Sequence, residues 1–453
     1  MELALVGESR FMRRRIGYTV LLAALALNLF FGATSYSRSA ELAEKNDIYG
    51  NLRLFSQVLE RVRQDYVDGE KLTYQELIYG ALKGMLNTLD PHSEFMEPQK
   101  YDDLKKETEG SFGGVGIQLG VRGEFLTVIA PIEGTPASRA GILPGDRIIR
   151  IEGKGTDRMS VTEAVKRLRG QPGTEVTISV LRPSTGAVKD HKLVRADINV
   201  PTVKDWEGKR EFPLGTDKIG YLRIIQFGEH TDAELDEALK RLSQAGLRGL
   251  IVDLRDNPGG LLDQAASVCG KFVPARTLLV STEGRDPAEK REYHATSRGL
   301  HVDVPMVVLV NGSSASASEI VAGCLQDLRR AVIVGEQTFG KGSVQSVIQL
   351  QDGAALRLTT AKYYTPSHKV IHEKGITPDI VIPLTPEETE ALFLKRTPGL
   401  LESLDPEQEE RVRAVRDVQF ERAKDLLKGI TLYTSRSPAG QQGHPDRVAT
   451  RSR

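Results

Sequence analysis

The stretch from Pro305 to Leu328, PMVVLVNGSSASASEIVAGCLQDL, indicates an apolar strand, a serine-rich turn and a helix in direct succession. The strand is predicted over 305–310, because this run is short, apolar and rich in valine. A helix is predicted after the turn, since apolar residues return at spacings of three and four: Ile320, Val321, Cys324, Leu325 and Leu328. Strands and helices alternate in this way from about 199 to 395, which predicts an α/β domain.

Ser316 stands at the predicted turn from strand to helix. The first N–H groups of a helix have no intrahelical partner and favour negative charge, so a nucleophile that forms an anionic intermediate would benefit from this position. Ser316 and Glu319 also have the spacing of a helix capping box, which is a purely structural alternative. By composition, Ser313, Ser314 and Ser318 are competing candidates.

A serine nucleophile requires a base, and none of the eight histidines stands in an obvious sequence context for that role. His368 and His372 are four residues apart, but Pro366 and Gly375 argue against the helix that a metal-binding pair would need. We therefore expect no metal site. A lysine can replace histidine if burial lowers its pKa, and Lys341 is the candidate.

Lys341 belongs to the segment Gly335–Gln345, which is a near miss to a phosphate-binding loop. That loop requires Ser or Thr after the lysine and then a helix, whereas Gly342 follows here. The apolar runs on either side of Asp352-Gly353 predict a β-hairpin instead. Nucleotide-dependent chemistry remains the alternative from this segment.

A third segment, Gly249–Leu261, predicts a buried strand that ends in a Gly-Gly turn. In α/β sheets, functional sites gather in loops at the carboxyl ends of strands. The backbone N–H of Gly260 could therefore bind an oxyanion, although an ordinary strand-to-helix turn explains the glycines equally well.

Four motifs in this order resemble a family of peptidases. They are Asn-Pro-Gly-Gly at 257–260, Ser-Ala-Ser-Ala-Ser-Glu at 314–319, Thr-Phe-Gly-Lys-Gly-Ser-Val-Gln at 338–345 and Gly-Ile-Thr-Pro-Asp at 375–379. Together they look like a carboxy-terminal processing peptidase, also called a tail-specific protease, and the resemblance spans about 51–383.

The resemblance implies a serine endopeptidase that needs no cofactor. Ser316 falls on the family's nucleophile, Lys341 on its general base and Gln345 on the residue that orients the lysine. The backbone N–H groups of Gly260 and Ala317 fall on the oxyanion donors. Because positions four apart on a strand share a face, we expect Lys341 and Gln345 to meet.

The family also carries a PDZ domain, and residues 106–198 resemble one. In this resemblance the backbone of Gly114, Val115, Gly116 and Ile117 would hold the terminal carboxylate of a substrate. The expected partners are protein substrates with free C-terminal tails. Without the resemblance, a glycine-rich hairpin over 113–116 is the better interpretation. A PDZ scaffold with an inactive peptidase domain is the alternative function, but it would be expected to lack Ser316 or Lys341.

The N-terminal region, 1–40, has the pattern of a membrane anchor. Arginines at 10, 13, 14 and 15 precede an apolar run over 16–34, which is long enough to cross a bilayer. The arginines would keep the N-terminus in the cytoplasm, so we expect a single-pass protein of the cytoplasmic membrane with its catalytic domain on the periplasmic, extracytoplasmic side. A cleaved signal peptide is the alternative.

The remaining expectations come from composition and periodicity. The 61 basic and 61 acidic residues balance, which argues against a nucleic-acid partner. Cys269 and Cys324 are too few for a disulfide scaffold, and the sequence leaves their pairing open. Residues 41–105 are predicted to be helical, and 396–453 to form one amphipathic helix and a disordered tail. We also expect a homo-oligomer.

Overall fold

The computed structural model describes residues 48–109, 111–132, 134–157, 159–296, 303–396, 401 and 404–436. Its contacts divide the chain into two units, 1–85 and 86–453, and each is described by itself. The predicted anchor at 16–34 lies outside the described residues. Within them, no helix combines the length and the apolar character that a bilayer crossing requires.

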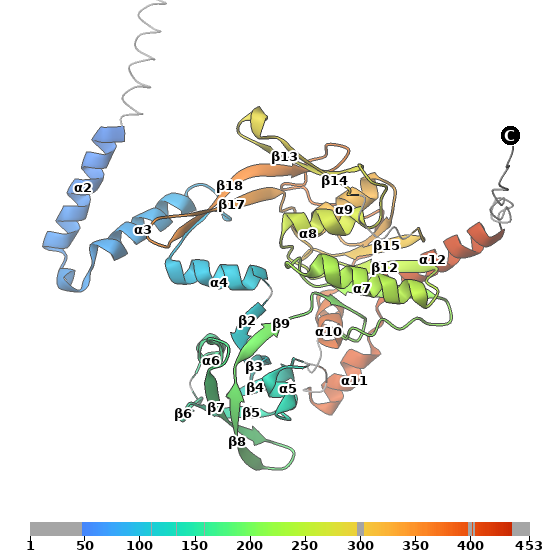
Figure 1. Ribbon diagram of the computed structural model, residues 1–453, viewed down its shortest axis with the longest axis horizontal. Helices are drawn as coiled ribbons and strands as arrows, with labels where there is room; N and C mark the ends of the chain where they lie inside the picture. Colours follow the sequence, from blue (N-terminus) through green and yellow to red (C-terminus); the bar gives the residue numbers. More distant parts are fainter. Residues whose placement is uncertain are drawn as a thin grey trace, which may run out of the picture. The chain divides into compact units, whose positions relative to one another are not determined.

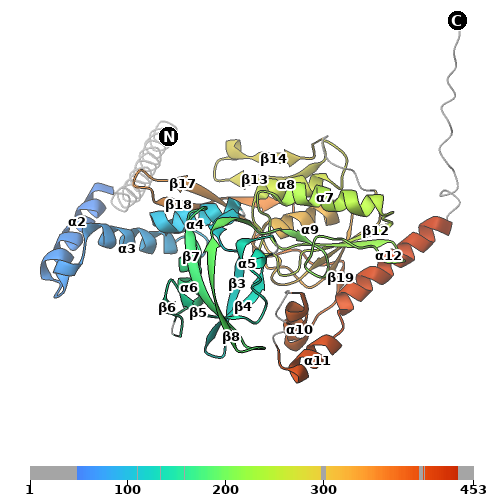
Figure 2. The ribbon, with the colours of Figure 1, turned by 60° about the horizontal axis from the view of Figure 1, so that its bottom comes forward.

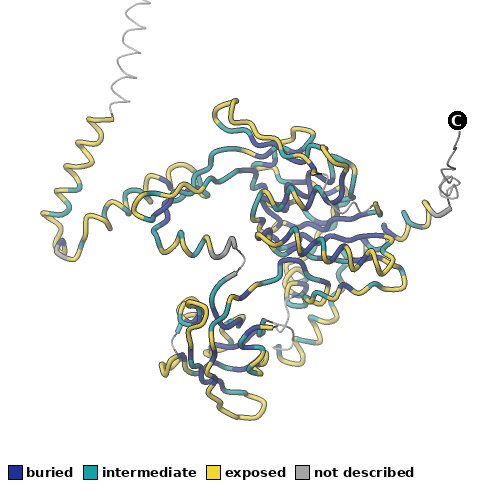
Figure 3. Tube along the Cα trace, viewed as in Figure 1, coloured by how far each residue is buried: buried dark blue, intermediate teal, exposed yellow. Residues whose placement is uncertain are grey.

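The first unit is helical, as the periodicity predicts. It contains α2 (Ile48–Asp65), the 3-10 turn η1 (Gly69–Lys71) and most of α3 (Tyr74–Asn87). No residue of α2 is buried, and Figure 3 shows most of the helix as exposed. The second unit adds α4 (Pro98–Glu109) and a short strand that the sequence analysis missed, β1 (Glu94–Met96).

The PDZ-like part is a small sheet with the strand order β3-β4-β5-β7-β8 (Figure 1). A second, separate pair joins β2 (Ser111–Gly114) to β9 (Ala196–Asn199). The other elements are β3 (Ile117–Arg122), β4 (Phe125–Pro131), α5 (Pro136–Arg139), β5 (Arg147–Ile151), β6 (Lys154–Gly155), α6 (Val161–Leu168), β7 (Glu175–Arg182) and β8 (Ala187–Val194). Because β2 pairs with β9 and not with β3, the alternative of a hairpin at 113–116 is wrong.

The peptidase core contains a six-stranded sheet in the order β10-β11-β12-β15-β16-β19, which is parallel from β11 onward. Its strands are β10 (Val203–Lys204), β11 (Ile219–Ile224), β12 (Gly249–Asp253), β15 (Met306–Val310), β16 (Val332–Gly335) and β19 (Ile380–Val381). The predicted α/β domain is confirmed by this parallel arrangement.

Helices cover both faces of this sheet, which explains why its strands are apolar throughout. On one face Val308 packs in a cluster with α7 (Thr231–Gln244), α8 (Leu262–Gly270) and α9 (Ala317–Asp327). On the other face Val307 and Leu309 pack against Ala423 and Leu427 of α12 (Val418–Arg436). Figure 3 shows these strands as buried.

A second, five-stranded sheet carries the predicted hairpin. It contains β17 (Ser343–Gln349) and β18 (Ala355–Tyr364), which pair antiparallel on either side of the Asp352-Gly353 turn (Figure 2). The other members are β1, β13 (Leu278–Gly284) and β14 (Arg291–His294), with the 3-10 turn η2 (Pro287–Glu289) between the last two.

The C-terminal region differs from its prediction. The described residues contain two helices after position 400, α11 (Pro406–Ala414) and α12, where one was expected. They follow α10 (Pro386–Arg396), and Asp405 caps α11 by accepting from Gln408 N. The open question of cysteine pairing is also answered: Cys269 and Cys324 are buried free thiols on α8 and α9.

Candidate active site

Three of the four sequence motifs meet at one edge of the parallel sheet. The Gly-Gly segment follows β12, the serine segment follows β15 and the lysine segment follows β16, and these three strands are neighbours. The carboxyl ends of parallel strands lie at the same edge, where sites form in α/β sheets. The fold therefore brings together loops that are about 60 and 25 residues apart in the sequence.

Ser316 occupies a strained turn between β15 and α9. It is the N-cap residue of α9, with φ +53° and ψ −113°, which is a costly backbone conformation for a residue with a Cβ. Gly259 lies against the turn so closely that an added Cβ would come within 2.8 Å of the Cβ of Ser316. A glycine is required at 259 to let the two loops approach each other.

The other serines of the motif have structural partners. The hydroxyl of Ser314 donates to Leu254 O (2.8 Å), that of Ser318 donates to Asn257 O (2.9 Å), and both residues are fully buried. Ser313 is exposed. The hydroxyl of Ser316 instead interacts with Tyr363, a residue whose pKa is raised to about 12, chiefly by burial. Among the four serines, these contacts favour Ser316 as the nucleophile.

The two candidate oxyanion donors are the N–H groups of Ala317, next to Ser316, and of Gly260, next to Gly259. Ala317 is the first residue of α9, where the N–H has no intrahelical partner. Gly260 has φ +145° and forms a bridge with Phe227 that uses the N–H groups of Phe227 and Leu261, not its own. Asn257 ties the loops together, because its carbonyl accepts from Ala315 N at 3.0 Å.

Lys341 lies in the turn before β17. Burial lowers the pKa of its ammonium, the charge of Arg357 lowers it further, and the carboxylate of Glu319 acts in the opposite direction. The glycines on either side let the turn pack against backbone: a Cβ on Gly342 would lie 2.1 Å from His372 N. The fourth motif packs against the same turn, although less tightly, since a Cβ on Gly340 would lie 3.3 Å from Gly375 N.

Glu319 joins the serine turn to the lysine turn, a connection that the sequence analysis did not foresee. Its fully buried carboxylate accepts from the N–H of Ser316 (2.8 Å), as a capping box requires. It also accepts from the N–H of Gly340 (2.7 Å) and of Lys341 (2.9 Å), and from the hydroxyl of Thr338. Burial raises the pKa of this carboxyl, although all four hydrogen bonds oppose that shift.

We expect Glu319→Gln to lower both stability and activity. The amide would direct an NH₂ group at backbone donors, so the free energy of unfolding should fall by about 1–3 kcal/mol. Loss of the negative charge should also lower the pKa of Lys341 and move the midpoint of the pH–rate profile to lower pH. Urea unfolding and a pH–rate profile measure the two effects. Glu336→Gln is the control, since Glu336 contacts Leu384 N and neither turn; an unchanged profile in Glu319→Gln would contradict the electrostatic role.

Contrary to the prediction from their spacing of four residues, Lys341 and Gln345 do not lie on one regular strand. Strand β17 begins at Ser343, so Lys341 precedes it, and the register shifts between Val344 and Gln345. The alternation of side chains along a regular strand therefore does not bring positions 341 and 345 together. The amide of Gln345 donates to Ser343 Oγ (2.9 Å) and Thr359 Oγ1 (3.3 Å). Its role in orienting Lys341 stays a prediction.

His92 is a neighbour of Lys341 that the sequence analysis missed. It lies within 41–105, which was predicted only to be helical, yet the side chain of Asp90 accepts from the N–H of His92 (2.8 Å) and stabilises a turn there. Arg357 Nε donates to the carbonyl of His92 (3.2 Å), which fixes the turn beside β18. Burial and the charge of Lys341 lower the pKa of His92. No local pattern signals a contact across about 250 residues.

The PDZ-like part presents an edge strand where a peptide is expected. Strand β3 is the last strand of its sheet, with β4 as its neighbour and α6 packed close to it. Gly114 is the last residue of β2, where it pairs with Ala196, and Val115 and Gly116 alone connect β2 to β3. Of the four predicted carboxylate-binding residues, Gly116 and Ile117 stand at the open start of β3. That assignment stays a prediction.

This fold, with a serine turn at the carboxyl edge of a parallel sheet and a PDZ-like part before it, is that of a serine-type peptidase with a PDZ domain. The model of peptidase family S41 matches residues 218–382, and that of the PDZ domain matches residues 127–182. A solved structure titled photosystem II D1 C-terminal processing protease is 31% identical, over 77% of this chain and 98% of its own, with a TM-score of 0.42.

Two curated relatives identify the family within this class of peptidases. A carboxy-terminal-processing protease of Bartonella bacilliformis is 43% identical, over 82% of this chain and 83% of its own. A carboxyl-terminal-processing protease of Synechocystis is 35% identical over 93% and 97%, respectively. The chain therefore belongs to the carboxy-terminal processing proteases of peptidase family S41. The resemblance recognised in the motifs is confirmed.

Proposed function

We propose that the chain is an endopeptidase in which Ser316 and Lys341 form a catalytic dyad. The observation that carries this proposal is the buried Glu319, which binds the backbone of both residues and so holds the two turns together. A desolvated lysine with a lowered pKa is suited to act as a base near neutral pH. The strained turn presents the hydroxyl of Ser316, whereas Ser314 and Ser318 are engaged in structural hydrogen bonds.

In the proposed reaction the oxygen of Ser316 attacks the scissile carbonyl while neutral Lys341 accepts its proton. The N–H groups of Gly260 and Ala317 bind the oxyanion of the tetrahedral intermediate. The lysine then gives the proton to the leaving amine, and water hydrolyses the acyl-enzyme. Gln345 supports this arrangement through Ser343, next to the lysine turn. Incubation with candidate protein substrates, followed by mass spectrometry of the new C-termini, tests the activity; no new C-terminus would contradict it.

We also propose that the PDZ domain selects substrates by their free C-terminal tails. A tail would extend the sheet along the open edge of β3, with its last side chain against α6 and its carboxylate at the N–H groups around Gly116 and Ile117. The edge position of β3 supports this mode of binding.

Amidation of the tail should weaken the recognition of a long substrate. It removes a charge-assisted acceptor worth about 1.5–3 kcal/mol, so we expect about a tenfold to hundredfold loss in affinity. Binding of paired acid and amide peptides, measured by fluorescence polarisation, gives this ratio. A substrate too short to reach the PDZ domain is the control and should be cleaved equally in both forms. Equal binding of the long acid and amide would leave the PDZ domain without this role.

Two further parts of the proposal concern location and assembly. The arginines at 10, 13, 14 and 15 and the apolar run 16–34 support a cytoplasmic-membrane anchor with the peptidase on the extracytoplasmic side. A membrane-spanning helix should require detergent for extraction. Release of the full chain from membranes by alkaline carbonate alone would contradict the anchor.

Homo-oligomerisation is supported by α2, on which Leu52, Phe55 and Val58 are 53%, 42% and 54% exposed at helical spacing. We propose that this face packs against another copy of the chain. Leu52→Asp with Val58→Asp should then reduce the molar mass in light scattering. An unchanged mass would contradict assembly through α2.

A further inference from the structure

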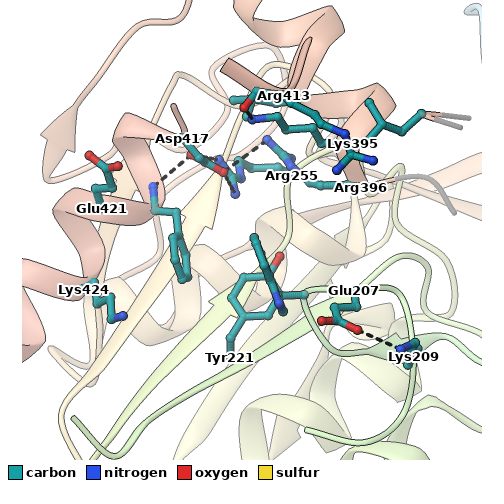
Figure 4. Close-up of a pocket in the computed structure, with 14 residues that line it drawn as sticks. Glu207, Lys209, Tyr221, Arg255, Lys395, Arg396, Arg413, Asp417, Glu421 and Lys424 are labelled. Atoms are coloured by element: carbon teal, nitrogen blue, oxygen red, sulfur yellow. Dashed lines mark hydrogen bonds and ion pairs between the residues drawn. The ribbon is translucent and has the colours of Figure 1, made fainter. Parts of the chain in front are cut away.

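A buried cluster of ion pairs joins the start of α12 to the loop that carries Gly260 (Figure 4). Arg255, two residues after β12, is 1% exposed. Its Nη1 donates to Asp417 Oδ1 and its Nη2 to Asp417 Oδ2, both at 2.9 Å, so the pair is bidentate. On its other side Nε donates to Asp253 Oδ1 at 3.0 Å. A residue 162 positions later in the sequence therefore supplies half of the counter-charge of Arg255.

The burial of this guanidinium makes its position dependent on both carboxylates. A charge removed from water must be compensated by close, well-directed partners, and loss of one partner leaves it uncompensated. The pKa of Arg255 is raised well above its usual value by the two aspartates, despite burial, and that of Asp253 is lowered. Arg396 is a second cation at longer distances. Its Nη2 lies 3.6 Å from Asp417 Oδ2, and its Nη1 lies 3.4 Å from Asp256 Oδ2.

Arg255 belongs to the loop Leu254–Gly260, whose remaining contacts lead to the serine turn. The carbonyl of Leu254 accepts from the hydroxyl of Ser314 (2.8 Å). Asp256, with φ +60°, exchanges two hydrogen bonds with Asn311, at 2.9 and 2.7 Å. The carbonyl of Asn257 accepts from Ala315 N (3.0 Å). A shift of Arg255 would therefore move both the Gly260 loop and the turn that holds the nucleophile.

A cavity of about 970 Å³ lies beside this cluster and has Arg255, Arg396 and Asp417 in its wall (Figure 4). Asp417 is 21% exposed, which makes it the most accessible member of its pair with Arg255. The contact between α12 and the loop is thus at the border of the core, where it can be changed without opening the apolar interior.

We propose that Asp417 is a positioning residue of the peptidase, which sets the Gly260 loop by holding Arg255. The C-terminal helix α12 is then part of the machinery that aligns the oxyanion donor. The proposal rests on the roles proposed above for Ser316 and Gly260, and adds a residue that no catalytic motif contains.

The test is Asp417→Asn in the full chain, because asparagine keeps the shape and the helix cap. Asp417 Oδ1 accepts from Phe420 N at 3.0 Å, and asparagine caps helices equally well. We expect kcat to fall about tenfold to a hundredfold, with KM for a long substrate unchanged, as for a misplaced transition-state donor. Asp417→Glu, which keeps the charge, should restore part of the rate.

Asp217→Asn is the matched control. Asp217 also binds α12, through Lys424 at 3.0 Å, and its other recorded partners within the described part of the chain, Lys428 and Ile219 N, lie outside the Gly260 loop. It should retain kcat even if its melting temperature falls as far as that of Asp417→Asn. A kcat for Asp417→Asn within about twofold of the unmodified chain, or an equal loss in Asp217→Asn, would overturn the proposal.

If Asp417→Asn does not fold, hydrogen exchange of the unmodified chain tests whether the start of α12 is coupled to the Gly260 loop. Labelling of the serine with a fluorophosphonate should slow exchange at 254–260 and also at 417–423, because coupling between the two segments is reciprocal. Slower exchange at 254–260 alone would overturn the proposal. An unmodified chain that is neither labelled nor active would instead contradict the proposed dyad, so the two failures can be told apart.

Discussion

Ser316→Ala should abolish proteolysis, with a loss of kcat on the order of 10⁴-fold or more, while thermal unfolding remains nearly unchanged. The hydroxyl lost here interacts with Tyr363, whereas the N–H of Ser316, which binds Glu319, is kept by alanine. Cleavage of a long substrate and differential scanning fluorimetry measure the two quantities.

Ser314→Ala is the control for this prediction. Its hydroxyl is buried against Leu254 O, so its removal should cost about 1 kcal/mol or more of stability and leave the mechanism intact. If Ser314→Ala lost activity in a folded protein while Ser316→Ala kept it, the nucleophile would be two positions earlier than proposed.

Lys341→Met should abolish activity without lowering stability. The amine lies in a partly desolvated site, which lowers its pKa below the usual value of about 10.4. Its protonation therefore reduces the free energy of unfolding. This penalty begins as the pH falls below about 10.4 and is complete below the lowered pKa. Methionine removes the base and this unfavourable charge together, and the melting temperature at pH 7 should stay equal or rise. Lys341→Arg should also be inactive, since a guanidinium remains protonated.

The same assignment predicts the pH dependence of the unmodified enzyme. Activity requires the neutral amine, so kcat should increase with pH up to the lowered pKa of Lys341 and then level off. Burial and the charge of Lys341 lower the pKa of His92, so His92 provides the control. His92→Asn should keep a rising profile. A folded His92→Asn protein without activity, together with an active Lys341→Met protein, would make histidine the base and contradict the dyad.

The motifs that identify the family are local, and for that reason they could be found in the sequence. An apolar strand, a turn and a helical period over 305–328 depend on backbone preferences and on burial of one segment, and the structure confirms each of them. The Asp352-Gly353 hairpin is confirmed for the same reason. Where local regularity is lost, as at the register shift after Val344, the argument from strand alternation no longer applies, and the role of Gln345 stays a prediction.

The sequence by itself thus determined the family, the α/β core and the segments that carry the candidate site, because these depend on patterns within about twenty residues of each other. Only the tertiary structure decided how the segments cooperate. It showed that Glu319 binds the lysine turn, that His92 lies near Lys341, and that Asp417 pairs with Arg255. Such contacts join residues that are far apart in the sequence and meet only when the chain folds. The residue type alone does not show whether a carboxylate is buried or exposed.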